Sequence, residues 1–160
     1  MAIRIIVKDP DPILREIAKS VPKVTPNIVK LLNDMADTMY DAGGVGLAAP
    51  QIGIQKRVIV LDPHDGETEL IELINPEMIH ADGEQLGTEG CLSIPGLNGD
   101  VNRKLNITVT GWDREGNEIT IEASDYLARI FQHEIDHLNG ILFTDIAESV
   151  YKIPPVEPGE

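Results

Sequence analysis

The feature that most constrains the fold is the stretch at residues 124–140, S-D-Y-L-A-R-I-F-Q-H-E-I-D-H-L-N-G. A serine before an amphipathic run and a glycine at its end are typical of helix ends, so we predict one α-helix here. At about 100° per residue, His133, Glu134 and His137 fall on its apolar face. Burying three ionisable groups costs several kcal/mol unless something pairs them. A bound metal ion would pair them.

Residues 133–137 form the pattern H-E-x-x-H. Histidines at positions i and i+4 lie one above the other on a helix, close enough to hold one cation, and Glu134 then points towards a water on that cation. The alternative is a pair of core histidines beside a surface glutamate. Because Glu134 does not fall on the polar face of the helix, we favour the metal site.

Two histidines need a third ligand, and two familiar ways of supplying one are missing. The first is a third histidine, but the position it would occupy is Phe143. The second is a glutamate on a later helix, but Glu148 is too near to the histidines in the chain and Glu157 lies in V-E-P-G, where no helix can form. Cys91 is the single cysteine and the only remaining soft ligand. A thiolate with two imidazoles leaves a fourth position for water, as in catalytic sites, and suits Fe(II), Zn(II), Ni(II) or Co(II).

The remaining patterns predict an α+β fold, with antiparallel sheets packed around a central metal-bearing helix. We expect strands over residues 2–7, 55–62 and 69–74, and a hairpin over 105–112 and 118–122. A short helix should run over 11–19, and a longer one from 25–26 to 43–44. The predicted core face of the longer helix is Ile28, Leu31, Leu32, Met35, Met39 and Tyr40. We expect a single catalytic domain over 1–160, with 153–160 as a flexible tail.

The charge balance excludes some classes of partner. There are 13 basic and 27 acidic residues, a net charge of −14, so we expect no direct binding to nucleic acid and none to membranes. The chain shows neither an apolar run of membrane-spanning length nor the pattern of a signal peptide. One cysteine suits a reducing compartment, and we expect a cytoplasmic monomer.

Three stretches, in this order, resemble the signature of the peptide deformylase family: G-V-G-L-A-A-P-Q at 44–51, E-G-C-L-S at 89–93 and Q-H-E-I-D-H at 132–137. The resemblance runs from the longer helix to residue 143. It implies an α+β metallohydrolase that removes the formyl group from N-formylmethionyl nascent peptides. It also implies Fe(2+) as the working ion, with Zn(2+) often found and Ni(2+) as a further option.

The resemblance also implies roles for particular residues. Cys91, His133 and His137 would hold the metal, and Glu134 would be the general acid/base for a metal-bound water that acts as the nucleophile. Gln51 and the backbone N–H of Leu92 would stabilise the oxyanion. Val45, Gly46 and Gly90 would line the substrate backbone. From helix geometry alone, Tyr126 and Ile130 would form a wall of a pocket for the methionine side chain, although Tyr126 could instead belong to the core.

This chain departs from some family members in two places. Some carry a long basic side chain after E-G-C-L-S, where this chain has G-L-N-G at 96–99. Some end in a basic helix that docks on the ribosome, which Y-K-I-P-P-V-E-P-G-E cannot form, so we expect no stable ribosome docking. Two alternative functions stay open: a general metallopeptidase with the same ligands, and a binding module whose metal is purely structural.

Overall fold

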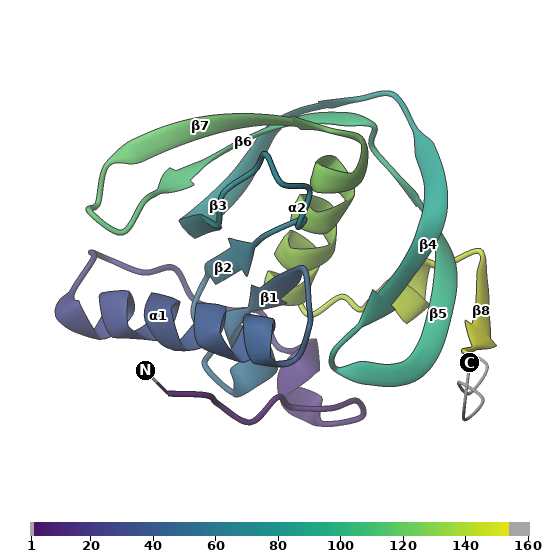
Figure 1. The fold of residues 1–160 in the computed structure, drawn as a ribbon, viewed down its shortest axis with the longest axis horizontal. Coiled ribbons are helices and arrows are strands. Elements are labelled where there is room, and N and C mark those ends of the chain that lie inside the picture. Colours follow the sequence, from purple (N-terminus) through teal and green to yellow (C-terminus); the bar gives the residue numbers. More distant parts are fainter. Residues whose placement is uncertain (1, 154–160) are drawn as a thin grey trace.

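The protein is described from a computed structural model that covers residues 2–153. Two antiparallel sheets flank the helix α2 (Asp125–Leu138), which lies at the centre of the molecule (Figure 1). One sheet has five strands in the order β1-β2-β3-β6-β7, and the other has three in the order β4-β5-β8. The α+β class, with antiparallel sheets around a central helix, is therefore confirmed.

The elements have the following bounds. The five-stranded sheet is formed by β1 (Gly46–Ala48), β2 (Val58–Leu61), β3 (Ile71–Asp82), β6 (Asn106–Trp112) and β7 (Glu118–Ser124). The three-stranded sheet is formed by β4 (Gln85–Cys91), β5 (Ile94–Arg103) and β8 (Ser149–Lys152). The other helices are α1 (Pro26–Asp41) and α3 (Phe143–Ile146), with 3₁₀ turns η1 (Pro12–Arg15) and η2 (Ala49–Ile52).

Helix α1 begins as its sequence predicts. The Thr25 side chain accepts a hydrogen bond from the backbone N–H of Ile28, and Pro26 occupies the first turn, where its missing N–H costs nothing. The apolar side of α1 packs against β1 and β2. The predicted core face is buried except at Tyr40, which is 43% exposed and donates a hydrogen bond to Asp62 Oδ2 at 2.6 Å.

Helix α2 packs against the five-stranded sheet through part of its surface and turns the rest towards β4. Ala128, Phe131 and Leu138 are fully buried in one apolar cluster with residues of β2, β3 and β6. At its C-terminal end, Arg57 donates a hydrogen bond to the carbonyl of Leu138 at 3.0 Å. Side chains on the remaining surface of α2 therefore meet the three-stranded sheet.

Several predicted elements differ from the observed ones. Residues 2–7 form no strand; their backbone instead bonds to α1, for example from the Arg4 N–H to Thr38 Oγ1 at 2.9 Å. The helix predicted over 11–19 is only the turn η1, because Glu16 is already extended. Strand β3 runs on to Asp82, since an irregularity in its pairing with β6 between Ile74 and Glu77 accommodates the intervening proline.

The glycine-rich stretch at 83–96, where the sequence predicts no strand, contains β4 and the start of β5. Of the predicted tail at 153–160, only Ile153 belongs to the described residues. Within residues 2–153, no helix combines the length and the apolar character that crossing a membrane requires.

The end of α2 provides a test of the packing around it. Gly140 has φ +74°, and an added Cβ would lie 2.4 Å from the carbonyl oxygen of Arg15. Gly66 has φ +79° with nothing within 4 Å, so it is a matched control for the backbone strain alone. We expect Gly66→Ala to lower the free energy of unfolding by about 1 kcal/mol, and Gly140→Ala by about 1–3 kcal/mol more. Equal losses in urea titrations at fixed metal content would contradict the packing.

Candidate metal centre

Three side chains, one from the three-stranded sheet and two from α2, meet at one point. His133 and His137 project from α2, and Cys91 lies at the end of β4. Their ligand atoms all lie within 4.8 Å of one another, a group that could hold a metal ion. Cys91 Sγ lies 3.3 Å from His137 Nε2, and the two imidazole centroids are 5.0 Å apart. The structure thus brings together the three residues proposed from sequence as ligands.

The orientation of His133 is set by Glu89, which the sequence reasoning left without a role. His133 Nδ1 lies 2.8 Å from Glu89 Oε1, so a proton on Nδ1 is donated there and Nε2 is left free. Glu89 lies two residues before Cys91 on β4, and both side chains reach α2. A carboxylate that orients a histidine in this way is typical of the surroundings of metal ligands.

Two arginines surround Glu89. Arg103 donates to both of its oxygens, at 2.8 and 2.9 Å, and Arg129 donates to Oε2 at 2.6 Å. Burial would raise the pKa of Glu89, but the hydrogen bonds from Arg103 and His133 outweigh it and hold that pKa far below its usual range. Arg103 also donates to Asp136 at 2.5 Å. Glu89 is therefore a buried, fully ionised carboxylate.

At about 100° per residue, the sequence predicts Arg129 on the polar face of α2, and this prediction is wrong. Arg129 is only 5% exposed, because it lies between α2 and the three-stranded sheet and bonds to Glu89 and to the carbonyl of Val101. A usable signal existed. Arg129 stands four residues before His133, one turn away on the same side of the helix, where a buried charge needs a partner.

The other buried carboxylate at the site is Glu134. It is 4% exposed, and its Oε1 has no hydrogen-bond partner among the described residues. Burial raises the pKa of Glu134 to about 7, with the charge of Glu89 adding to the effect. Room for this carboxylate depends on Gly46, since a Cβ there would lie 2.5 Å from Glu134 Oε2. Glu134 is thus poised to exchange a proton near neutral pH.

The surroundings of the two histidines shift their pKa values in opposite directions. Burial lowers the pKa of His137 well below its usual value, so its imidazole is neutral. Burial also acts to lower the pKa of His133, but Glu134, Cys91 and Glu89 outweigh it and raise that pKa well above the usual value. These neighbours stabilise a positive charge on His133, which a bound metal ion can supply in place of the proton.

Gln51 lies on the other side of the sulfur. Its Nε2 donates to Ser93 Oγ at 3.1 Å and points to Cys91 Sγ at 3.6 Å, and its Oε1 accepts from the Ala48 N–H at 2.9 Å. At 1% exposure the amide is held in one orientation, so an exposed loop position for Gln51 is excluded. Leu92 follows Cys91 directly and is partly buried beside β1 and α1.

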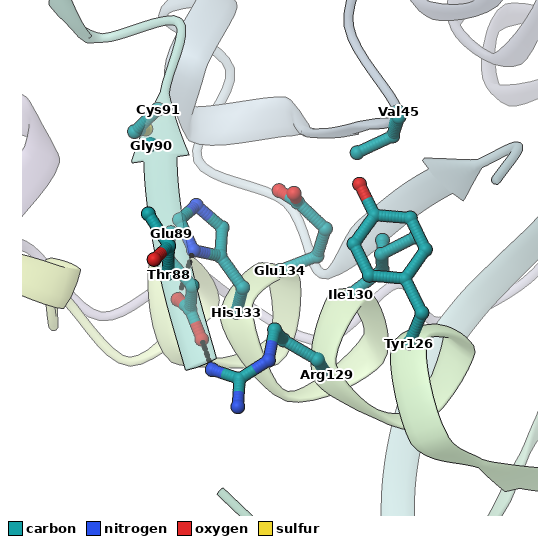
Figure 2. A pocket seen from close by; sticks show the side chains of 10 residues that line it. All are labelled: Val45, Thr88, Glu89, Gly90, Cys91, Tyr126, Arg129, Ile130, His133 and Glu134. Atoms are coloured by element: carbon teal, nitrogen blue, oxygen red, sulfur yellow. Dashed lines mark hydrogen bonds and ion pairs between the residues drawn. The ribbon is translucent and has the colours of Figure 1, made fainter. Parts of the chain in front are cut away.

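A pocket opens beside Glu134, with a volume of about 90 Å³ (Figure 2). Val45, Tyr126, Ile130 and Gly90 line it, together with Cys91, His133 and Glu134. In Figure 2 the side chains of Glu134 and Tyr126 rise from α2 towards Val45. Tyr126 is 50% exposed, so its interpretation as a core residue is wrong. The pocket gathers most of the residues that the sequence analysis assigned to the substrate; Gly46 lies against Glu134 but does not line it.

The donor set fits a divalent transition metal. One sulfur and two imidazole nitrogens are the soft and borderline ligands that such ions prefer, and three protein ligands leave a position open. The unpartnered oxygen of Glu134 lies on the adjoining pocket wall. His64 and His80 take no part: His64 Nε2 lies 3.1 Å from the Gly44 carbonyl, and His80 pairs with Asp82.

Comparison with known proteins gives one family. The family model described as "Polypeptide deformylase" matches residues 3–152. A peptide deformylase of Carboxydothermus hydrogenoformans is 57% identical over 95% of this chain and 98% of its own. One of Symbiobacterium thermophilum is 56% identical over 100% of this chain and 73% of its own.

Solved structures agree. A crystal structure of a peptide deformylase from Legionella pneumophila matches with a TM-score of 0.88 and 48% identity, over 92% of this chain and 87% of that one. The complex of a Synechococcus elongatus peptide deformylase with actinonin matches with a TM-score of 0.86 and 41% identity, over 91% of this chain and 79% of that one.

The contact between Glu89 and His133 predicts a change in metal affinity. We expect Glu89→Gln to weaken metal binding by about 10–100-fold, because His133 loses the carboxylate that orients it. Affinity would be measured by competition with a chromophoric chelator, with circular dichroism to establish that the variant is folded. Glu122→Gln, an exposed position on β7, is the control. A folded Glu89→Gln variant with unchanged affinity would contradict the role of this carboxylate.

Proposed function

Since the chain belongs to the polypeptide deformylase family, we propose that it removes the formyl group from the N-terminal formyl-methionine of nascent peptides. The observation that carries the proposal is the meeting of Cys91, His133 and His137 beside the buried, unpartnered carboxylate of Glu134. Three ligands and a free base at the wall of an open pocket are the requirements of a hydrolytic metal site.

Cys91, His133 and His137 would hold one divalent ion, with Fe(2+) as the working metal and Zn(2+) or Ni(2+) as substitutes. Such an ion lowers the pKa of a bound water to about 7, which makes a hydroxide nucleophile available at neutral pH. The chain contributes the orientation of the ligands. Glu89 fixes His133, and burial keeps His137 neutral, as a ligand must be.

Glu134 moves the proton. Its carboxylate accepts a proton from the water that attacks the formyl carbon, and then donates that proton to the departing amine. Formate and a free N-terminal amine are the products. A pKa near 7 suits both steps, because the group can give up the proton as readily as it takes it.

Gln51 and Leu92 stabilise the negative charge that develops on the carbonyl oxygen. Gln51 Nε2 lies 3.6 Å from Cys91 Sγ, and the backbone N–H of Leu92 directly follows Cys91 in the chain. Ser93 holds the Gln51 amide at 3.1 Å, so this donor requires little rearrangement. Losing one such donor costs about 10²–10³ in rate in other enzymes.

The pocket explains the choice of substrate. Val45, Tyr126 and Ile130 offer an apolar space beside Glu134 for the methionine side chain. Val45, Gly46 and Gly90 would run along the substrate backbone. A formyl carbon carries only hydrogen, so a confined space near Glu134 admits it more easily than larger acyl groups.

The proposed setting rests on several features of the sequence. The net charge of −14 supports the absence of direct nucleic-acid and membrane contact, the single cysteine supports a cytoplasmic protein, and the proline-rich end at 151–160 supports the absence of stable ribosome docking. The protein would act as a monomer on free or emerging peptides. We keep residues 1–160 as one catalytic domain within this proposal.

The role of Glu134 predicts a separation of metal binding from catalysis. We expect Glu134→Ala, and the shape-conserving Glu134→Gln, to retain the metal but to lower kcat by about 10²–10⁴-fold. Metal content by atomic absorption and turnover of a formyl-methionyl peptide would be measured on the same sample. A variant that loses its metal, together with a wild type that never hydrolyses the peptide, would favour the structural-metal alternative.

The substrate proposal predicts discrimination between acyl groups. We expect kcat/KM for a formyl-methionyl peptide to exceed that for the acetylated peptide by at least about 10–200-fold, the range for one added methyl group. Internally cleavable peptides without a formyl group should be left intact. Equal turnover of formylated, acetylated and unblocked peptides, followed by mass spectrometry, would instead identify a general metallopeptidase.

A further inference from the structure

A second hollow continues from the catalytic pocket. This groove has a volume of about 390 Å³ and shares Val45, Gly90, Cys91 and Tyr126 with the pocket. It extends along the turn after β4 and the start of β5, and Ile153 also lines it. A peptide whose methionine occupies the pocket has this groove as the continuous space for the residues that follow.

Ile153, which directly follows β8, is the last residue of the described chain that lines the groove. β8 pairs with β5, with Lys152 opposite Leu97, and the Ile153 N–H bonds to the carbonyl of Gly96 at 2.9 Å. The segment 96–99, where some relatives carry a long basic side chain, is therefore a paired strand in this chain.

Asp100 fastens β8 in place. Its carboxylate accepts hydrogen bonds from Ser149 Oγ at 2.9 Å and from Tyr151 Oη at 3.0 Å, and its carbonyl accepts one from the Glu148 N–H at 2.8 Å. Tyr151 Oη also lies 3.4 Å from Thr88 Oγ1, which lines the catalytic pocket. β8, the strand that leads to Ile153, is thus hydrogen-bonded to both β4 and β5, the strands that border the site.

The lining of the groove is uncharged. Charged residues make up 25% of the chain, yet among the described residues those that line the groove include none. Its apolar lining residues include Leu92, Ile94, Pro95, Leu97 and Ile153. A charged peptide side chain placed there would lose water without gaining a partner, whereas an apolar one would be favoured.

We propose that Ile153, held in place by β8, forms part of the wall of the substrate groove and contacts a side chain downstream of the formyl-methionine, selecting apolar over acidic residues. This inference rests on the proposed deformylation and adds to it a specificity-determining residue. The matching ligand is a formylated peptide with an aliphatic residue at its second or third position.

The test compares selectivity rather than activity alone. Formyl-Met-X-Ala and formyl-Met-Ala-X peptides, with X as Leu or Glu, would be assayed for kcat/KM with the wild type, Ile153→Lys and Val150→Lys. Val150 lies on β8, the strand that leads to Ile153, is 44% exposed and lines neither hollow, so its variant adds the same charge away from the groove. Ile153 is 46% exposed, so the substitution leaves the core intact.

We expect the wild type to prefer Leu over Glu by at least about tenfold at one of the two positions, and Ile153→Lys to reduce that ratio about tenfold or more, while Val150→Lys keeps it. Equal ratios for the wild type and Ile153→Lys would overturn the inference, as would an equal shift in both variants. Failure of the underlying function looks different, because then no formylated peptide is turned over by any of the three proteins.

Discussion

The carboxylate of Glu89 is the group on which the geometry of the site depends. It accepts hydrogen bonds from Arg103 on β5 and from Arg129 and His133 on α2, so one side chain of β4 joins the helix to the three-stranded sheet. Apolar packing holds α2 against the other sheet, and it has no directional preference. Hydrogen bonds to Glu89 supply the direction that brings the sulfur of Cys91 opposite the two imidazoles. A buried charge group of this kind is costly if any member lacks a partner, so it favours a single arrangement of the two layers.

Local patterns in the sequence predicted those elements whose structure is decided locally. Helix α1 and the β6–β7 hairpin were found because capping or turn residues and a clear period coincide in each. Helix α2 was found from its period and its glycine stop, since Ser124 donates to Asn106 Oδ1 and makes no side-chain capping bond. The class of fold followed from them. The meeting of Cys91 with the histidines could be predicted for a different reason: three soft ligands in one chain have few ways to be satisfied other than by a shared ion.

The remainder could not be predicted because it depends on contacts between distant segments. β4 and β5 contain glycines that argue against strands, and pairing with each other and with β8 stabilises them all the same. Arginine is usually a surface residue. Arg129 can be buried only because it pairs with Glu89, a carboxylate 40 positions earlier in the chain. Residues 2–7 alternate like a strand, but a strand needs a neighbouring sheet edge to pair with. Backbone N–H groups of this segment bond instead to side-chain oxygens of α1.

The two buried carboxylates of the site have separate environments, and this difference supports their separate roles. Glu89, surrounded by two arginines and an imidazole, has its pKa held far below the usual range, so near neutral pH it can orient His133 but does not exchange protons. Glu134 has no donor to its Oε1 among the described residues, and burial together with the charge of Glu89 raises its pKa to about 7. Pairs of acids whose surroundings move their pKa values apart are the usual basis of acid/base assignments in enzymes. The arginines therefore affect Glu134 as well. Because their positive charges balance the negative charge of Glu89, a second carboxylate can be buried beside the same histidine, without a partner and ready to exchange a proton.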